Sequence, residues 1–316
     1  MIEARHITKR YHAAAAAVND VTFTAADGSV TGLLGPNGAG KSTTLNILAG
    51  CLAPSSGEAL LDGHDVFEEP EAAKRTLGYL PEQPPLYPEM TPEEYLLFVA
   101  ALRGVPKKAR AGEVERVMEL AGVTDMRRRL IRQLSKGCCQ RVGVAQALVG
   151  DPKNILLDEP TGGLDPKQLI HMRSLIRSLG GAHTVILSSH ILSEVQAVCD
   201  RVLILSGGAL AAGGTQAELG ERVRGKTVLR LTVRGRQRDV ERVLRQLAGG
   251  DGFVAVEEDG VVRAELHADG PDAREKAFFA FGKKGLPILE MTSEKTTLED
   301  VFLECTGQGE DGGGQA

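Results

Sequence analysis

The segment Gly35-Pro36-Asn37-Gly38-Ala39-Gly40-Lys41-Ser42-Thr43 has the pattern G-x-x-x-x-G-K-S/T. It follows an apolar run at residues 30–34, which predicts a buried strand. It precedes residues 45–49, which predict a helix that ends at Gly50. A glycine-rich loop between a strand and a helix is the context in which this pattern binds phosphate. The sequence therefore predicts a site for a nucleoside triphosphate, with all nine residues of the loop in contact with it.

Each part of this loop has a physical role in the prediction. Its glycines let the backbone curl, so that successive N–H groups point toward phosphate oxygens. The start of the following helix adds its partial positive charge at the same place. Lys41 is expected to reach the β- and γ-phosphates, and the Ser42 hydroxyl is expected to ligate Mg²⁺.

The composition is that of an ordinary globular protein. The chain has 316 residues, of which 42% are hydrophobic and 25% are charged, and its net charge is −5. Because this charge is negative, no nucleic-acid partner is expected. No window approaches 18 consecutive apolar residues, so no membrane span is expected, and the N-terminus lacks the apolar core of a signal peptide. The five cysteines have no disulfide spacing, which favours a reducing cytosol.

The pattern of the first 221 residues predicts one α/β domain. Short β runs separated by helices favour a largely parallel sheet, and residues 2–8 and 18–25 alternate as antiparallel strands do. Residues of about 84–153 predict an inserted layer of helices. One of these helices begins at Thr91-Pro92-Glu93-Glu94, which has the order of a capping box.

A second domain is predicted from about residue 222 to 306. Its elements follow the order βαββαβ, which is the ferredoxin-like α+β arrangement, and residues 298–302 predict a closing helix. Residues 307–316 are rich in glycine and predict a flexible tail.

Two acids follow a buried strand at residues 155–157. Asp158 ends this strand, where it is expected to hold Mg²⁺. Glu159 comes next and is expected to polarise an attacking water. An acidic turn at a strand end is the alternative interpretation, but it is a poor one downstream of a phosphate loop.

A further segment, Leu134-Ser135-Lys136-Gly137, precedes this strand by about twenty residues. Together with the loop and the two acids, it resembles the signature of the ATP-binding subunits of ABC transporters. The resemblance implies a P-loop NTPase (RecA-like) core with an antiparallel β subdomain and a helical subdomain. It also implies that Ser135 and Gly137 contact the ATP bound by an opposite subunit. Lys136 is typical of exporters of the gliding-motility and multidrug type, whereas Cys138-Cys139 depart from the family pattern.

Four more residues receive a role from this resemblance. Gln83 matches the glutamine that senses Mg²⁺ and the membrane partner, and Asp165 lies in the loop that crosses the dimer. His190 matches the histidine at the γ-phosphate, although a buried structural histidine is the alternative for such a residue alone. Tyr11 matches the aromatic residue that stacks on adenine, and packing against the sheet is its alternative role.

The resemblance implies an ATPase that powers an exporter through ATP-driven closure of a homodimer, with ATP and Mg²⁺ as cofactors. Its partners would be a second copy of the chain and a separate transmembrane permease, which would hold it at the inner face of the cell membrane. A soluble ABC ATPase that acts on ribosomes or DNA is the alternative. Such proteins usually carry two cassettes or long coiled coils, and this sequence has neither.

Overall fold

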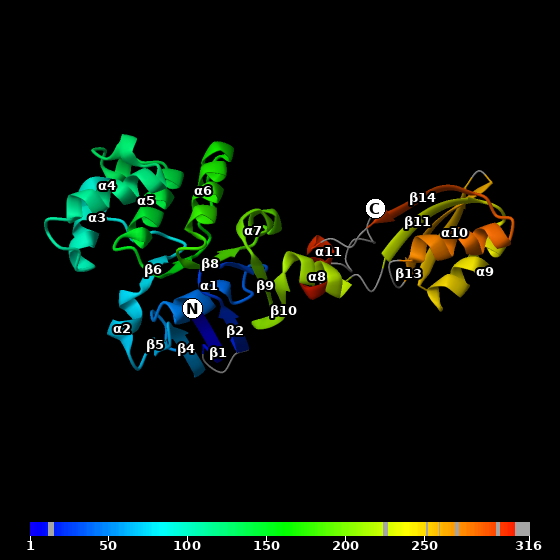
Figure 1. The fold of residues 1–316 in the computed structure, drawn as a ribbon, viewed down its shortest axis with the longest axis horizontal. Coiled ribbons are helices and arrows are strands. Elements are labelled where there is room, and N and C mark those ends of the chain that lie inside the picture. Colours follow the sequence, from blue (N-terminus) through cyan, green and yellow to red (C-terminus); the bar gives the residue numbers. More distant parts are fainter. Residues whose placement is uncertain are drawn as a thin grey trace. The chain divides into compact units, whose positions relative to one another are not determined.

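The computed structural model describes residues 1–11, 16–223, 227–250, 252–258, 260–268, 272–294 and 298–306. Its contacts divide the chain into two units, Met1–Thr215 and Gln216–Ala316 (Figure 1). The division comes after Thr215 rather than after residue 221, where the sequence places it. The predicted tail, residues 307–316, lies outside the described residues. No described helix is long and apolar enough to cross a lipid bilayer.

A six-stranded sheet forms the centre of the first unit. Its strand order is β10-β9-β3-β8-β7-β6, and all neighbours are parallel except the antiparallel pair β9 and β10. Strands β3, β7 and β8 are buried along their whole length, as expected for strands covered on both faces. The strands are β3 (Val30–Leu34), β6 (Leu77–Leu80), β7 (Asn154–Leu157), β8 (Thr184–Ser189), β9 (Arg201–Ser206) and β10 (Ala209–Thr215).

A second sheet of four antiparallel strands packs beside it, in the order β2-β1-β4-β5. One hydrophobic core joins the two sheets through helix α1 (Lys41–Leu48), whose Leu45 and Ile47 are fully buried. The helix that carries the phosphate loop is therefore fixed by both sheets. The strands are β1 (Ile2–Lys9), β2 (Val18–Ala25), β4 (Ser56–Leu61) and β5 (His64–Asp65).

Helices α3, α4 and α5 form a layer in the segment between β6 and β7 (Figure 1). The predicted capping box is confirmed, because the Thr91 side chain accepts from the Glu94 N–H and the Glu94 side chain accepts from the Thr91 N–H. The other helices of this unit are α2, α6 and α7, and the short α2 and α7 are not predicted from the sequence. Their bounds are α2 (Pro70–Arg75), α3 (Pro92–Leu102), α4 (Arg110–Ala121), α5 (Lys136–Leu148), α6 (Pro166–Leu179) and α7 (Leu192–Val198).

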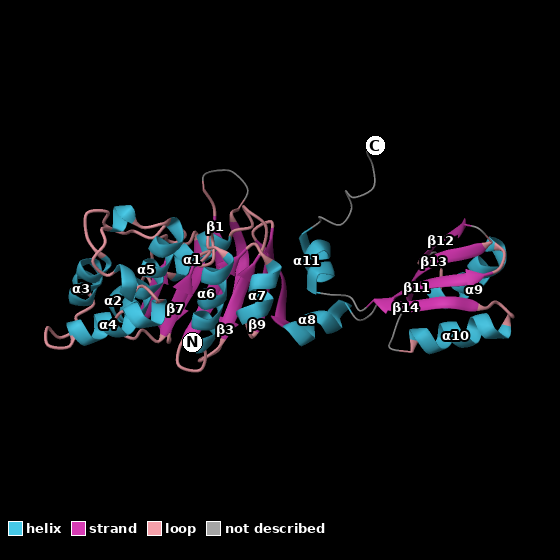
Figure 2. Cartoon of the chain, turned by 90° about the horizontal axis from the view of Figure 1, so that it is seen from above, coloured by secondary structure: helices cyan, strands magenta, loops and turns pink. Residues whose placement is uncertain are grey.

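The second unit contains the predicted ferredoxin-like arrangement. Its four antiparallel strands have the order β12-β13-β11-β14, and α9 and α10 pack on the sheet over a core of their own (Figure 2). Helices α8 and α11 contact each other. The elements are α8 (Gln216–Val223), β11 (Thr227–Arg234), α9 (Gln237–Ala248), β12 (Phe253–Glu258), β13 (Val261–Ala268), α10 (Ala273–Lys283), β14 (Ile288–Glu294) and α11 (Leu298–Thr306).

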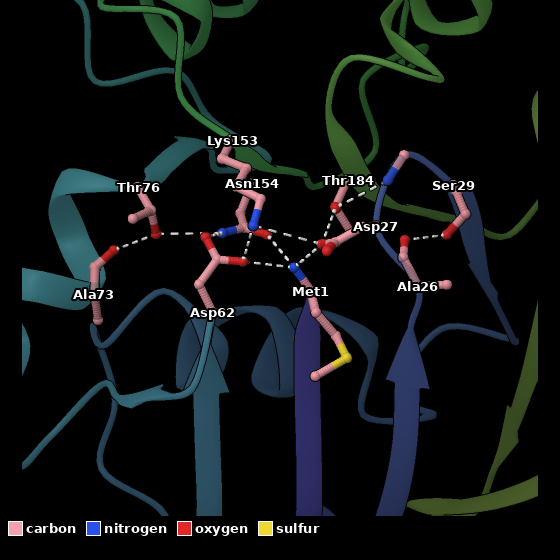
Figure 3. Close-up of polar contacts among 11 residues, drawn as sticks. Met1, Ala26, Asp27, Ser29, Asp62, Ala73, Thr76, Lys153, Asn154 and Thr184 are labelled. Atoms are coloured by element: carbon pink, nitrogen blue, oxygen red, sulfur yellow. Dashed lines mark hydrogen bonds and ion pairs between the residues drawn. The ribbon is translucent and has the colours of Figure 1, made fainter.

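A polar cluster joins the two sheets of the first unit (Figure 3). The fully buried Asn154, at the start of β7, donates from Nδ2 to Asp62 Oδ2 (3.0 Å) and to Thr76 Oγ1 (3.2 Å). Asp62, which follows β4, also accepts from Lys153 Nζ (2.9 Å) and from the Met1 ammonium (2.6 Å). One carboxylate therefore connects the end of β4 in the antiparallel sheet to the start of β7 in the central sheet.

The charge of Asp62 is expected to stabilise the fold. Burial alone raises its pKa, but the hydrogen bonds from Met1, Lys153 and Asn154 outweigh burial and hold the pKa below its ordinary value. The stabilisation is thus fully present above the ordinary pKa of about 4 and is lost as the pH falls through the lower folded-state pKa. We expect Asp62→Asn to lower the free energy of unfolding by about 1 kcal/mol at pH 7.

Urea unfolding of both proteins at pH 7 and near pH 3 measures this difference. Glu58→Gln, in the exposed part of β4, is the matched control and should unfold like the wild type. A difference between wild type and Asp62→Asn that is the same at both pH values would show that the charge is not responsible.

Candidate active site

A cleft of about 920 Å³ lies in the first unit. Its walls come from the phosphate loop, the segment after β6, the start of α5, the loop after β7 and the end of β8. The predicted site residues that line it are Asn37, Gly38, Gly40, Lys41, Ser42, Thr43, Gln83, Glu159 and His190. Segments from many parts of the sequence thus converge on the predicted nucleotide site.

Two glycines of the phosphate loop are required by close backbone approach. A Cβ atom on Gly35 would lie 2.5 Å from the Leu205 carbonyl oxygen. Gly40 has φ of +99°, and a Cβ atom there would lie 2.5 Å from the Ala17 carbonyl oxygen. Any larger residue would push the loop away from Leu205 of β9 and from Ala17, which precedes β2. The backbone path of the loop therefore depends on both glycines.

Lys41 is held in place by the loop itself. Its side chain is 5% exposed, and Nζ donates to the carbonyl oxygens of Gly35 (2.8 Å) and Pro36 (3.2 Å). The same Nζ lies 3.7 Å from Glu159 Oε1. The ammonium group is thus positioned at the wall of the cleft beside a carboxylate.

Asp158 lies beneath the cleft and is 2% exposed. Its Oδ1 accepts from the Ser42 hydroxyl (3.2 Å) and from the Ser188 hydroxyl (2.6 Å). Ser188 Oγ in turn accepts from the backbone N–H of Glu159 (2.9 Å). The sequence assigned no role to Ser188, although a hydroxyl residue at the carboxyl end of a buried strand, two residues before His190, is a signal for one.

The oxygen ligands at this point suit a magnesium ion. Mg²⁺ prefers carboxylate and hydroxyl oxygens, together with the phosphates of a nucleotide. Asp158 and Ser42 place such oxygens 3.2 Å apart next to the phosphate loop, and the exposed Gln83 lines the same cleft. These three residues could hold the ion.

Glu159 and His190 meet in the cleft. Glu159 Oε2 lies 3.0 Å from His190 Nδ1, and the Glu159 side chain is only 15% exposed, whereas His190 is about half exposed. Lys41 lies on the other side of the same carboxylate. A carboxylate held between a cation and an imidazole is suited to polarise a water molecule.

Ser135 and Asp165 do not line this cleft; both cap helices. The Ser135 side chain caps α5 by accepting from the Cys138 N–H (3.3 Å). Asp165 caps α6 by accepting from the Gln168 N–H (2.9 Å). Within one chain these two residues have a structural role at helix starts.

Gly137 and Tyr11 also lie away from the lining of the cleft. A Cβ atom on Gly137 would be 2.2 Å from Gln168 Oε1, so the first turn of α5 lies against the Gln168 side chain at the start of α6. Tyr11 is 46% exposed, and the Lys9 ammonium lies 5.5 Å from the centre of its ring. The Tyr11 ring is therefore available at the surface.

A buried acid that the sequence did not single out supports the loop after Glu159. Glu194, on α7, is 7% exposed and accepts from the Ser189 hydroxyl (3.2 Å) and from the Thr161 hydroxyl. This contact ties α7 to the loop that follows Glu159. It joins residues far apart in the sequence, and no local pattern predicts it.

Comparison with known proteins identifies the family. The chain matches the ABC transporter family model over residues 18–162. It is 32% identical to the linearmycin resistance ATP-binding protein LnrL of Bacillus subtilis, over 98% of this chain and 99% of that protein. The chain belongs to the ATP-binding proteins of ABC transporters. It is also 32% identical to the bacitracin transport ATP-binding protein BcrA of Bacillus licheniformis, over 98% of each chain.

Solved structures agree with this assignment. The ATP-binding subunit of an ABC transporter superposes with a TM-score of 0.65 at 29% identity, over 71% of this chain and 93% of that one. A dimeric ATP-binding cassette in a post-hydrolysis state, bound to ADP and Pi, superposes with a TM-score of 0.63 at 25% identity, over 68% and 98% of the two chains. The predicted family and P-loop fold are confirmed, and the chain is an ATPase.

The two cysteines that depart from the family pattern have different surroundings. Cys138 Sγ accepts from the Ser135 hydroxyl (3.1 Å) and lies 3.7 Å from Arg141 Nη2. Burial raises the pKa of Cys138, but these contacts outweigh it and lower the pKa below the ordinary value. Burial raises the pKa of Cys139, whose thiol faces the Ile131 carbonyl oxygen (3.8 Å).

Cys138 is therefore expected to react with iodoacetamide faster than Cys139 at neutral pH, because the thiolate is the reactive form. Mass spectrometry of the alkylated peptides over time measures the two rates. Faster alkylation of Cys139 would contradict the assignment of these environments.

The double variant Cys138→Ala/Cys139→Ala should keep ATPase activity within a few-fold, since alanine replaces both thiols with a small side chain that still fills the space.

Proposed function

We propose that this chain powers an ABC exporter by hydrolysing ATP at two composite sites of a head-to-tail homodimer. The observation that supports this most directly is the position of the Glu159 carboxylate between Lys41 and His190. This arrangement places one carboxylate, one ammonium and one imidazole at the end of a phosphate loop. Such a set can bind a γ-phosphate and act on a water beside it.

In this proposal the phosphate loop holds the nucleotide. The backbone N–H groups from Gly38 to Thr43 and the Lys41 ammonium bind the β- and γ-phosphates. Tyr11, which is exposed, stacks on adenine. Ser42, Asp158 and Gln83 hold Mg²⁺, which neutralises charge on the phosphates when it is bound.

Glu159 acts as the general base for the attacking water. Its carboxylate accepts a hydrogen bond from the water and draws on the proton as the oxygen attacks the γ-phosphorus. His190, 3.0 Å from Glu159, contacts the γ-phosphate and fixes the direction of the carboxylate. The low exposure of Glu159 and Lys41 strengthens their electrostatic action, because little water screens them.

A second copy of the chain completes each site. Ser135 and Gly137 lie at the start of α5, whose N-terminus attracts anions, and are proposed to contact the γ-phosphate bound by the opposite subunit. Asp165 lies in the loop proposed to cross the interface. The dimeric form of a structural neighbour that covers the cassette supports this assembly.

A membrane permease is the other proposed partner. Tyr87 follows Gln83 closely in sequence, is 49% exposed and contacts the exposed Phe98 of α3, with ring centres 5.7 Å apart. Exposed aromatic side chains are favoured at protein interfaces. We propose that this surface receives the permease at the inner face of the cell membrane. The names of LnrL and BcrA, which refer to linearmycin resistance and to bacitracin transport, support an export role.

Lys41→Ala should lower the affinity for ATP by roughly ten-fold or more, because it removes a full charge from the β- and γ-phosphates. Isothermal titration calorimetry with ATP measures this change. Lys108→Ala, an exposed lysine that does not line the cleft, is the control and should bind like the wild type. Unchanged affinity in Lys41→Ala would mean that the nucleotide binds elsewhere.

Glu159→Gln should slow hydrolysis by roughly two to four orders of magnitude, the usual effect of losing a general base. ATP binding should persist, because Lys41 and the loop amides do not depend on the carboxylate. The variant should therefore accumulate as an ATP-dependent dimer, which size-exclusion chromatography with light scattering detects.

Glu82→Gln changes another carboxylate in the wall of the cleft and serves as the matched control, with hydrolysis within a few-fold of wild type. If Glu159→Gln stays monomeric at saturating Mg-ATP, or turns over like the wild type, the composite-site mechanism is wrong.

A further inference from the structure

The backbone of Glu159 is in an unusual conformation. Its φ is +47°, in the left-handed region that residues other than glycine rarely adopt. Such a conformation persists only where the surrounding structure holds it. Since this backbone aims the carboxylate toward Lys41 and His190, the groups that hold it also determine where the carboxylate points.

Both peptide groups of Glu159 are hydrogen bonded. Its N–H donates to Ser188 Oγ (2.9 Å). Its carbonyl oxygen accepts from the Gly162 N–H (3.1 Å), within the following turn, and from Gln140 Nε2 (3.3 Å). Among these, the bond from Gln140 is the one that comes from the helical layer.

Gln140 lies in the second turn of α5 and is 2% exposed. Because a carbonyl oxygen can only accept, the amide nitrogen of Gln140 must face Glu159. Helix α5 begins at Ser135, and Gly137 packs closely on Gln168 of α6. The helix that starts with the signature segment therefore reaches the backbone of the general base through one buried side chain.

We propose that Gln140 is a positioning residue that links the signature helix to Glu159. This proposal rests on the proposed composite site. A shift of α5 when Ser135 contacts the nucleotide of the opposite subunit moves the Gln140 amide, and the strained backbone of Glu159 follows. Engagement of the signature segment is thereby transmitted to the Glu159 carboxylate, which lies between Lys41 and His190.

Gln146 on the same helix serves as a matched control that separates a positioning role of Gln140 from a purely structural one. Gln146 also lies on α5 and donates from Nε2 to a backbone carbonyl, that of Tyr79 (3.4 Å). Its bond points to β6 rather than to Glu159. If the Gln140 bond only anchors the helix, the two glutamines should respond alike to substitution.

The first experiment compares Gln140→Met with Gln146→Met in the full-length chain. Methionine keeps the length of the side chain but removes the donor. Gln140→Met should lower kcat about ten-fold, the effect of one hydrogen bond, with KM for ATP within two-fold. Gln146→Met should keep kcat within two-fold, and the unfolding midpoints of the two variants should be alike.

The second experiment uses Gln140→Glu, which has a donor only while the new carboxyl is protonated. Burial beside Glu159 should raise the pKa of that carboxyl, so activity relative to wild type should rise as the pH falls. This variant also serves if the methionine variant does not fold. An activity ratio to wild type that stays constant with pH would contradict the positioning role.

The third experiment is a double-mutant cycle between Ser135→Ala and Gln140→Met. Linked residues should be non-additive in kcat, so that the double variant is slowed by less than the product of the two single effects. The same cycle with Gln146→Met should be additive. Additivity in both cycles would contradict the link between the signature helix and Glu159. An equal loss of kcat in Gln140→Met and Gln146→Met would also contradict it.

Failure of the composite site would give a different experimental result from failure of the Gln140 link. In the Glu159→Gln background, Gln140→Met should leave the ATP-dependent dimer intact, because positioning does not contribute to ATP binding. If Glu159→Gln itself does not dimerise, the composite site fails. The comparison of kcat between Gln140→Met and Gln146→Met still decides whether Gln140 positions Glu159.

Discussion

The buried carboxylate of Asp158 is the interaction on which the active site depends. A charge at 2% exposure is costly unless it is paired or hydrogen bonded. Hydroxyl groups from Ser42 on α1 and Ser188 on β8 satisfy it. The phosphate-loop helix and two neighbouring strands are thereby tied to one point, directly before Glu159. The position of Glu159 relative to the phosphate loop is thus a consequence of how the sheet satisfies this one charge.

Helix α5 of the helical layer packs closely against strand β6 of the central sheet. A Cβ atom on Gly78 of β6 would lie 1.9 Å from the Ala147 carbonyl oxygen, and one on Gly143 of α5 would lie 2.6 Å from Leu80 Cδ1. Because there is no space for larger side chains, α5 rests against β6 with backbone in contact. The C-terminal half of α5 is thus fixed on the sheet, so the proposed link to a second subunit depends on movement of its first turns, where Ser135 and Gln140 lie.

Much of this fold can be predicted from local patterns, and the rest depends on contacts between distant residues. The strand, phosphate loop and helix around Lys41 and the capping box at Thr91 are local, and both were predicted. Helices α2 and α7 are too short to form on propensity alone, so only tertiary contacts can stabilise them. The same holds for α8, which contacts α11 and begins the second unit of the chain. Ser188 and Gln140 act on Glu159 across 29 and 19 residues of sequence, and no periodicity indicates such bonds.

The carbonyl groups that hold Lys41 have a consequence for the thermodynamics of nucleotide capture. A free lysine side chain loses up to about 2 kcal/mol of rotamer entropy when it is fixed. In this protein the Gly35 and Pro36 carbonyl oxygens fix the side chain during folding. Little of that entropy remains to be lost when a phosphate arrives. The Lys41 side chain is thus preorganised, which lowers the entropic cost of binding a phosphate.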